Sequence, residues 1–496
     1  MKNIPFNNLY HALGESFFYR ADPSPVSNPA LIRFNEALAE ELGIEAGGYS
    51  DSELAAVFSG NVIPDGATPI AMAYAGHQFG NFVPQLGDGR AILLGEISTT
   101  GGNTMSLQLK GSGQTVFSRN GDGRAALGPV LREYIVSEAM HHLGVPTTRA
   151  LAAVTTGEEV ARDRFLPGGI ITRVASSFVR VGTFEYFSSR GDVASIQKLA
   201  DHVIAQNYPE LVEADNPYDA LLQAVTDRQA SLIAQWMQLG FIHGVMNTDN
   251  MSVAGETIDY GPCAFMDAYA HDQVFSSIDR YGRYAYSNQP SIGLWNLARL
   301  AEALLPLIDE NVDAAVERAQ DILQTYQSRH EDEWLTGMCT KCGLFNVTEE
   351  SKPQDKSLVQ DLLDLMAGNS SDFTLTFFHL SQLSALPSDE DQACKILFNH
   401  REDFEHWLER WRERLGQESH SDEQRQKDMQ AVNPVYIPRN HQVEAAIRAA
   451  EDQDDFSVFH ALHEVLQNPY VRQAGKDHYM QPPKPEEVVQ RTFCGT

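Results

Sequence analysis

The spacing of apolar residues changes partway along the chain. Between about residues 70 and 185, short runs alternate between apolar and polar positions, which is typical of β-strands. We expect strands and a hairpin in the runs RAILLGEI (90–97), MSLQLKG (105–111) and RALAAVTTGEEVARD (149–163). From about residue 187 onward the apolar residues recur every three or four positions, as in ALLQAVTDRQASLIAQWMQLG, and this spacing predicts helices.

Two helices are expected in or before the strand-rich part. GPVLREYIVSEAMHHLG (128–144) has apolar residues along one side and ends at Gly144, which predicts a single helix among the strands. NPALIRFNEALAEELG predicts an amphipathic helix that is capped by Asn28 and ended by Gly43. The polar segment 416–430 predicts a surface loop or an exposed helix end.

A strand-rich lobe with one helix, followed by a mostly helical lobe, is the bilobal plan of protein kinases. We therefore predict an α+β fold of this kind, with extensions at both ends of the chain. The predicted parts are an N-terminal extension (1–68), a strand-rich N-lobe (69–186), a helical C-lobe with the catalytic loop (187–415) and a C-terminal extension that packs back on the core (416–496).

Composition narrows the classes of function. The 496 residues include 37 Lys and Arg against 67 Asp and Glu, a formal net charge of −30. Such a charge repels phosphates, so we expect neither a general nucleic-acid binder nor an anionic-membrane binder. A nucleotide can still bind where cations and a metal gather locally. Only five cysteines, no apolar signal core and no apolar run of about 18 residues favour the cytoplasm.

The stretch FIHGVMNTDNMSVAGETIDYGPCAFMD contains groups used by kinase-type phosphotransferases, with one of them displaced. Kinases place the base Asp two residues after a His, and a metal-binding Asn five residues after that Asp. His243 and Asn250 keep this frame, but Val245 stands where the base belongs. The acid is found instead at Asp249, beside the Asn. The pattern fits either an inactive kinase or a kinase-like fold with different chemistry.

The same stretch predicts a metal site. Asp259, Tyr260 and Gly261 match the place of the kinase Asp-Phe-Gly. Asn250 and Asp259 are oxygen donors of the kind that Mg²⁺ takes together with nucleotide phosphates.

Two glycine-rich loops are candidates for contact with phosphates. In QLGDGRAILLGE, Gly87 and Gly89 allow close approach of the backbone to a phosphate, and Arg90 adds a cation. The tetrapeptide Gly-Asp-Gly-Arg recurs at residues 121–124 and brings in Asp122 and Gly123. A Gly-Asp-Gly between strands is usually only a turn, but the two loops flank one strand that ends in a lysine.

That lysine, Lys110, resembles the strand lysine with which kinases contact nucleotide phosphates. Its partner would be a glutamate on the following helix, and Glu133 and Glu138 are both candidates. Glu133 is preferred because it borders the apolar side of the helix. Arg173 and Arg180 are further candidate cations, but seven residues apart they face opposite sides of a regular strand. Their convergence on one ligand requires a bend, and we expect it near Ser176-Ser177.

The longer motifs resemble one family. QLGDGRA, LQLKGSGQTVFSRNGDGRAALGPVLREYIVSEAMHHLGVPTTRALA, HGVMNTDNMS and DYGPCAFMD are similar to those of the selenoprotein O (SelO, YdiU) family, as are VNPVYIPRNHQVEAAI and the terminal FCGT. The resemblance implies a protein-kinase-like fold that binds ATP in an inverted orientation. It implies transfer of AMP, not phosphate, to Ser, Thr or Tyr hydroxyls of proteins, including the enzyme itself, by a cytoplasmic bacterial protein. With the nucleotide inverted, the base can be Asp249 although Val245 stands at the kinase position.

The resemblance also assigns roles to residues. The implied metal, Mg²⁺ or Mn²⁺, is held by Asn250 and Asp259; the proton acceptor is Asp249; and Glu133 supports the lysine. Redox regulation through Cys263 and Cys494 is implied as well, although the tail ends in Gly-Thr where Ser-Ser is common. The implied ATP contacts are Gly87, Gly89, Arg90, Lys110, Asp122, Gly123, Arg173, Arg180 and Asp259.

Three other functions stay open from the sequence. A divergent kinase would transfer the γ-phosphate, although the absence of a carboxylate at Val245 speaks against it. A non-catalytic pseudokinase would bind nucleotide, or none, without turnover, and the intact pair of Asn250 and Asp259 speaks against that. UTP could also replace ATP, which would make the reaction UMP transfer.

Overall fold

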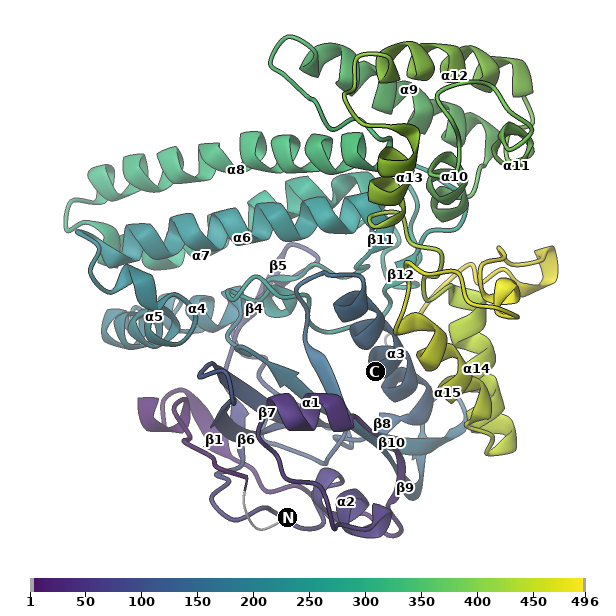
Figure 1. Cartoon of the computed structure of the whole chain (residues 1–496). Helices are drawn as coiled ribbons and strands as arrows, with labels where there is room; N and C mark the ends of the chain where they lie inside the picture. Colours follow the sequence, from purple (N-terminus) through teal and green to yellow (C-terminus); the bar gives the residue numbers. More distant parts are fainter. Residues whose placement is uncertain (1–3, 494–496) are drawn as a thin grey trace.

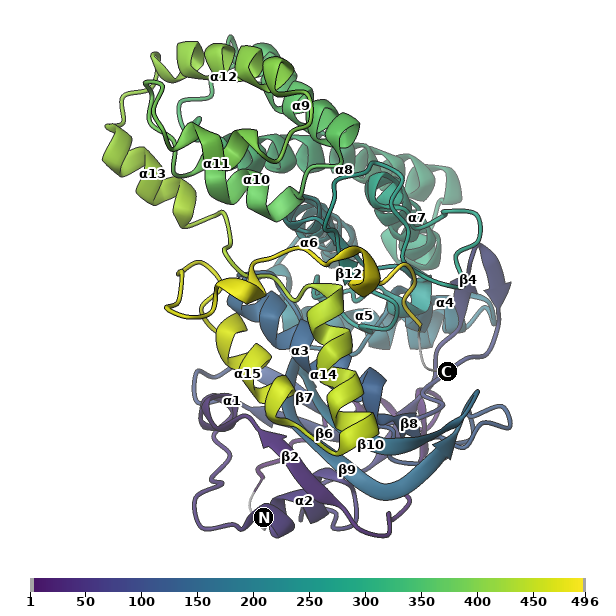
Figure 2. The same ribbon diagram turned by 90° about the vertical axis from the view of Figure 1, so that its right-hand side faces the viewer.

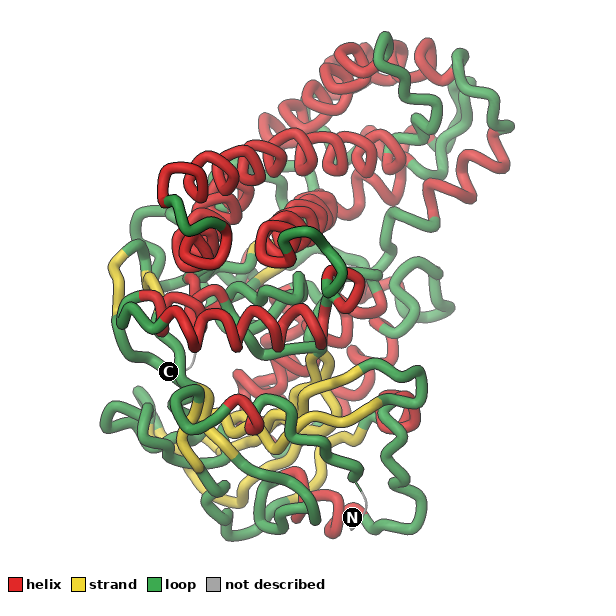
Figure 3. The backbone as a smooth tube through the Cα atoms, turned by 90° about the vertical axis from the view of Figure 1, so that its left-hand side faces the viewer, coloured by secondary structure: helices red, strands yellow, loops and turns green. Residues whose placement is uncertain are grey.

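The computed structural model describes residues 4–493, and these form two lobes (Figure 1). The large sheet lies in one lobe and the long helices in the other, as the colours of Figure 3 show. The predicted order, a strand-rich lobe followed by a helical lobe, is confirmed.

The main sheet has eight strands, and all of its pairings are antiparallel. Their order is β1-β3-β6-β7-β10-β9-β2, with β8 beside β10. The runs predicted from alternation form β6, β7 and β9, and β9 continues into a hairpin with β10. The strand bounds are β1 (Phe18–Arg20), β2 (Ala30–Phe34), β3 (Ile70–Met72), β6 (Ala91–Ser98), β7 (Thr104–Lys110), β8 (Ala125–Ala126), β9 (Arg149–Ala161) and β10 (Phe165–Ala175).

The prediction of one helix from Asn28 to Gly43 is wrong in its first half. Residues Ala30–Phe34 form β2, which covers the open edge of β9, and the helix α1 (Glu36–Glu41) starts only after it. Asn35 caps this helix, because its side chain accepts a hydrogen bond from the backbone of Leu38. A sheet edge leaves backbone groups that need partners, and pairing with it overrides the helical spacing of the apolar residues. Helix α2 (Asp51–Phe58) follows.

Helix α3 (Leu127–His142) is the predicted helix among the strands, and it is buried on nearly all sides. One side packs on β9 and β10, and the C-terminal helices α14 (Asn440–Gln453) and α15 (Ser457–Leu466) cover another (Figure 2). Its two glutamates, Glu133 and Glu138, are therefore withdrawn from water.

The helical lobe is built around α6 (Pro217–Leu239), α7 (Gln289–Ile308) and α8 (Val312–Lys341), which pack side by side (Figure 1). By length and composition alone α7 could cross a membrane, but it packs between the other helices of this lobe. The remaining helices are α4 (Val181–Ser188), α5 (Val193–Asn207), α9 (Lys352–Asn369), α10 (Phe373–Leu380), α11 (Asp391–Lys395), α12 (Arg401–Leu415) and α13 (Asp422–Gln430). Two small hairpins complete the fold, β4 (Gly76–Gln78) with β5 (Asn81–Val83) and β11 (Phe241–Ile242) with β12 (Ala264–Phe265).

The polar segment 416–430 is more ordered than the sequence suggests. Its second half is α13, which Ser421 caps through a hydrogen bond from the backbone of Gln424. Arg425 and Met429 of this helix are buried. The expected surface loop is found at residues 416–421, whereas residues 422–430 form a complete helix with two buried positions, which the polar sequence did not indicate.

Candidate active site between the lobes

The segment after α6 is fixed by hydrogen bonds of its histidine. Gly240 ends α6 in the left-handed conformation, at φ +69°, and the chain turns into β11. The Nε2 atom of His243 donates to the carbonyl of Ile258 at 2.9 Å, and its backbone N–H donates to the side chain of Gln289. Burial lowers the pKa of His243, so the imidazole stays neutral. His243 thus holds the residue before Asp259 in place and is not free to act as a base.

Asn250 and Asp259 present the oxygen atoms that the sequence predicts. The Nδ2 atom of Asn250 donates to the carbonyl of Val245 at 3.0 Å, which leaves its amide oxygen to face a ligand. Asp259 has a left-handed backbone, at φ +60°, which is uncommon for a residue with a side chain. Val245 itself is buried, so no acid stands at the kinase base position.

Arg173 and Arg180 converge on Asp259, through a bend at the place that the sequence predicts. Strand β10 ends at Ala175, the chain bends from Ser176, and Arg180 lies at the entrance of α4. Arg173 Nη2 lies 2.8 Å from one oxygen of Asp259, and Arg180 Nη2 lies 3.5 Å from the other. Burial alone would raise the pKa of Asp259, but the two arginines and Lys110 hold it well below its ordinary value. Asp259 is therefore ionised at any physiological pH.

The partner of Lys110 is Glu133, and the alternative is excluded. Lys110 Nζ lies 2.6 Å from Glu133 Oε2, and Arg173 binds the other oxygen of this carboxylate. Glu138 instead forms a two-point ion pair with Arg149 at 2.9 Å. Burial and the neighbouring Arg173 lower the pKa of Lys110, and an anionic group beside it, such as Glu133 or a phosphate, favours its charged form.

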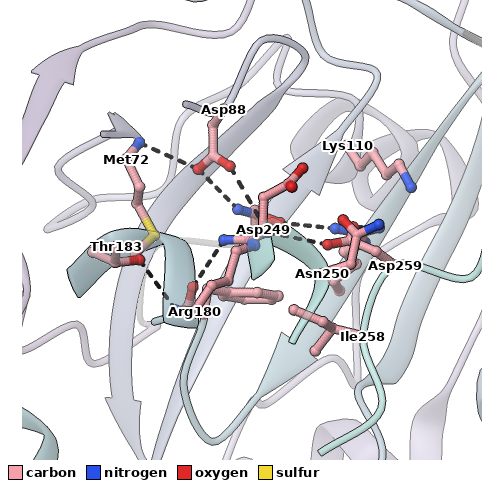
Figure 4. Close-up of polar contacts among 12 residues, drawn as sticks. Met72, Asp88, Lys110, Arg180, Thr183, Asp249, Asn250, Ile258 and Asp259 are labelled. Atoms are coloured by element: carbon pink, nitrogen blue, oxygen red, sulfur yellow. Dashed lines mark hydrogen bonds and ion pairs between the residues drawn. The ribbon is translucent and has the colours of Figure 1, made fainter. Parts of the chain in front are cut away.

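The first glycine loop also contains an acid that we did not select from the sequence. Asp88 is buried between Gly87 and Gly89; it accepts hydrogen bonds from the backbone of Met72 and the side chain of Gln108 and lies 4.0 Å from Arg180 (Figure 4). Burial raises the pKa of Asp88 to about 6. Its position in GDG was the available signal, but such an acid is usually part of a turn.

Only glycine fits at the two flanking positions of this loop. Gly87 has φ +87°, and a Cβ there would lie 2.3 Å from the ring of Phe117. A Cβ at Gly89 would lie 2.9 Å from the carbonyl of Phe117. The charge of Arg90, next in the chain, acts on Lys110, which places this arginine in the same cluster.

The second glycine loop does not reach the cluster through its acid. Asp122 lies at the surface, where it is paired with Arg162 at 2.8 Å and accepts a hydrogen bond from the backbone of Arg124. Gly123 has φ +67°, and its carbonyl accepts a hydrogen bond from the backbone of Gly113. In this structure the loop is a glycine turn braced by Arg162, which holds the carboxylate of Asp122 at the surface.

Asp249 has one oxygen without a partner. Its Oδ2 accepts a hydrogen bond from Gln78 at 3.3 Å, whereas Oδ1 is buried and accepts none in the described part of the chain. Burial raises the pKa of Asp249 to about 6. Gly76 makes room for this carboxylate, because a Cβ there would lie 2.7 Å from Oδ1. A carboxylate with a raised pKa and a free oxygen is suited to accept a proton.

The β4–β5 hairpin, which the sequence did not reveal, holds the loop before Asp249. His77 is 2.5 Å from Glu185, which also accepts a hydrogen bond from Thr248. The backbone of His77 donates to the hydroxyl of Thr248 at 2.7 Å. The hairpin has a two-residue turn, Phe79-Gly80, and both turn residues have positive φ. The signal in the sequence was weak, because a phenylalanine is rare in such a turn.

Comparison with known proteins matches this geometry to a family. Residues 1–467 match the family described as "Protein adenylyltransferase SelO". Three relatives are named "Protein nucleotidyltransferase YdiU": those of Bradyrhizobium diazoefficiens, Rhizobium rhizogenes and Rhizobium meliloti. They are 56%, 57% and 56% identical and cover 100%, 99% and 100% of this chain and 99%, 97% and 100% of their own.

The chain belongs to the SelO family. As a SelO protein it has a kinase-like fold and is an enzyme, a nucleotidyltransferase. In this SelO chain Lys110, Glu133 and Asp259 lie together between the lobes and are the candidates for a nucleotide site.

A divalent metal fits the donors of this SelO site. The amide oxygen of Asn250 and the ionised carboxylate of Asp259 are hard oxygen ligands, which Mg²⁺ and Mn²⁺ prefer. Among residues 4–493 no group of three His, Cys, Asp or Glu side chains is placed to hold a metal unaided. Such a two-ligand site suits a metal that takes its other ligands from nucleotide phosphates and water.

Cys263 and the chain leading to Cys494 lie close together. Cys263 is buried, and Cys494 lies outside the described residues. The hydroxyl of Thr492 donates to the carbonyl of Pro262 at 2.6 Å, and the backbone of Thr492 pairs with residues 275 and 277. The chain therefore reaches the neighbour of Cys263 two residues before Cys494.

Proposed function

We propose that this protein transfers AMP from ATP to hydroxyl groups of Ser, Thr or Tyr side chains in proteins and releases pyrophosphate. One observation carries the proposal. Among the described residues from His243 to Asp259, only Asp249 has a buried carboxylate oxygen without a partner, whereas the kinase base position is occupied by the buried Val245. The names of the family and of the relatives support nucleotidyl transfer to proteins.

The reaction balances with the residues of the site. The hydroxyl oxygen bonds to the α-phosphorus, the bond from that phosphorus to the bridging oxygen breaks, and pyrophosphate leaves. Asp249 accepts the hydroxyl proton, a contribution of about 10²–10⁴-fold to the rate. Lys110, Arg173 and Arg180 neutralise the charge of the triphosphate and of the departing pyrophosphate. A divalent metal would be held by Asn250 and Asp259 and would supply further positive charge at the phosphates.

Labelled nucleotides test the transferred group. The purified protein is incubated with Mg²⁺ or Mn²⁺ and with ATP labelled at either the α- or the γ-phosphate, and label retained on protein is measured. We expect retention only from α-labelled ATP, with a mass gain of one AMP. Retention only from the γ-labelled form would establish a divergent kinase, and no retention from either would favour a pseudokinase. A parallel series with α-labelled UTP measures the competing UMP transfer.

Two variants test the assigned roles. Asp249→Ala should leave ATP binding largely intact and lower turnover by about two to four orders of magnitude, because a base contacts the incoming hydroxyl and not the phosphates. Asp259→Ala should abolish transfer and metal-dependent ATP binding together. Loss of ATP affinity in Asp249→Ala, or near-normal activity in Asp259→Ala, would contradict these roles.

A further inference from the structure

An open groove lies beside the catalytic segment and is not part of the nucleotide cluster. Its volume is about 630 Å³, and it lies between the turn of the β4–β5 hairpin, the segment 278–283 and the first turns of α7. Figure 1 shows β4 and β5 beside the helical lobe. The lining residues are Phe79, Ile278, Asp279, Arg280, Tyr281, Arg283, Asn288, Ser291 and Ile292.

The wall of the groove is tied to the proposed base. The backbone N–H of Phe79 donates to the side-chain oxygen of Asn247 at 3.0 Å, and the hydroxyl of Tyr284 donates to the same oxygen at 2.5 Å. Gln78, next to Phe79, donates to Asp249. Phe79 is also held in the left-handed conformation, at φ +52°, a strained backbone of the kind that persists at functional sites. A segment bound in the groove would contact Phe79, and the neighbouring residue, Gln78, is hydrogen-bonded to Asp249.

Two arginines of the groove lack an anionic partner. Arg280 is exposed, and neither Arg280 nor Arg283 forms an ion pair with any residue of 4–493. The Nε and Nη2 atoms of Arg283 are buried without a hydrogen-bond acceptor, and its guanidinium lies 4.8 Å from the ring centroid of Trp295. The single acid of the lining, Asp279, is buried and accepts hydrogen bonds from the backbone of Arg283 and Tyr284. Buried guanidinium donors that lack an acceptor point to an anionic ligand.

The rim of the groove is apolar and accessible. The relative exposure of Tyr281 is 98% and that of Ile278 is 52%. Exposed aromatic and aliphatic side chains beside arginines are typical of protein-binding surfaces. The lining carries two arginines against one aspartate, so the groove has a local positive charge that would attract an acidic segment, although the whole chain has a net charge of −30.

We propose that this groove binds the substrate protein, as an extended segment that carries an Asp or Glu carboxylate near the hydroxyl to be modified. The carboxylate pairs with Arg280 and Arg283, and an apolar side chain packs on Ile278 and Tyr281. The inference rests on the proposed function, in that it assigns the groove to the protein that supplies the hydroxyl. A nucleotide is less suited to the groove, because Lys110, Arg173 and Arg180 already provide a separate site for its phosphates.

Binding is measured separately from chemistry, so that the two proposals can fail separately. Three fluorescent peptides share a central Ser and an apolar neighbour and differ only in flanking Glu, Gln or Lys residues. Fluorescence anisotropy gives their dissociation constants for the wild type and for Arg280→Glu, Arg283→Gln and the control Arg401→Glu. Arg401 is exposed at the start of α12, a helix that lies well away from β4 and β5 in Figure 1, and its substitution makes the same change of charge as Arg280→Glu.

The expected order of affinity for the wild type is acidic, then neutral, then basic, with the acidic peptide bound at least about tenfold more tightly than the basic one. Arg280→Glu should remove or invert this preference, Arg283→Gln should weaken it at least about threefold, and Arg401→Glu should keep it. ATP-induced thermal stabilisation should be unchanged in all three variants, which shows that they fold. Equal binding of the three peptides, no binding, or a preference that survives Arg280→Glu would overturn the groove assignment.

Transfer to the same peptides separates this proposal from the proposed function. If α-label reaches peptides without regard to their flanks, AMP transfer stands and the groove assignment falls. If the arginine-dependent preference holds but only γ-label is transferred, the groove stands and the proposed reaction falls.

Discussion

Glu133 and Glu138 form a matched pair for testing which buried charge serves the nucleotide. Both lie on α3, both are at most 2% exposed, and both pair with an arginine. Glu133 bridges Lys110 and Arg173, whereas Glu138 binds Arg149 and the backbone of Ala150. The substitutions Glu133→Gln and Glu138→Gln keep the side-chain shape and remove the charge. They should cost similar stability but differ in nucleotide binding.

The structure sets the size of the stability loss. Removing one partner of a buried ion pair costs about 3–5 kcal/mol, because the other charge stays buried and uncompensated. In Glu133→Gln the guanidinium of Arg173 keeps Asp259 at 2.8 Å, and in Glu138→Gln Arg149 keeps only Glu41 at 3.9 Å. We therefore expect losses near the lower end, about 3 kcal/mol for each variant.

The pH dependence of this loss has a definite sign. Burial raises the pKa of Glu133, but Arg173 and Lys110 outweigh it and hold the pKa below the ordinary 4.5. The stabilisation by the carboxylate is therefore complete above pH 4.5 and is lost as the pH falls through the lower value in the folded protein. The difference between wild type and Glu133→Gln should shrink in the same range.

Urea unfolding with and without ATP and Mg²⁺ measures both effects. ATP at about 100 times its dissociation constant should stabilise the wild type and Glu138→Gln by about 2.7 kcal/mol. Glu133→Gln should lose most of this stabilisation, because Lys110 and Arg173 are no longer oriented toward the phosphates. Normal stabilisation of Glu133→Gln by ATP, or an equal loss in Glu138→Gln, would refute the assignment of Glu133.

The pH profile, one glycine and one cysteine pair offer three more tests. Because Asp249 must be ionised to accept a proton and its pKa is about 6, kcat at saturating ATP should fall about tenfold per pH unit below 6. The control Asp88→Asn should keep this pH profile. A flat profile down to pH 5 would contradict the role of Asp249. Gly76→Ala should lower kcat at least about tenfold with ATP binding unchanged, because the added Cβ lies 2.7 Å from Asp249 Oδ1; Gly47→Ala, with open space around it, is the control, and equal rates would show that the close approach is unimportant. Oxidation should yield a Cys263–Cys494 cross-linked peptide in non-reducing mass spectrometry, because Thr492 is docked beside Pro262, and its absence while other cysteines pair would end the redox proposal.

The local pattern of apolar and polar residues was enough to predict the secondary-structure elements whose residues follow one regular spacing along their length. Strand β6 is mostly apolar, β7 alternates between apolar and polar residues, and α3 carries apolar residues every three or four positions, so these patterns predict them. The relative placement of His243, Asp249, Asn250 and Asp259 could likewise be predicted from the sequence, because residues close together in a tight loop also lie close together in space. Matching long motifs to a family added the proposed role of Asp249, which spacing alone left open.

Tertiary structure decided whatever depends on partners far along the chain. The stretch from Asn28 to Gly43 has helical spacing, yet the open edge of β9 makes residues 30–34 a strand. Glu133 and Glu138 are both buried acids on one helix, and only the positions of Lys110 and Arg149 on different strands give them different partners. Asp88 and Asp122 occupy the same position in the two copies of Gly-Asp-Gly-Arg. Arg162 nevertheless holds Asp122 at the surface, while Asp88 is buried near Arg180. Ionic partners and burial are set by contacts across the fold, and one-dimensional spacing does not record them.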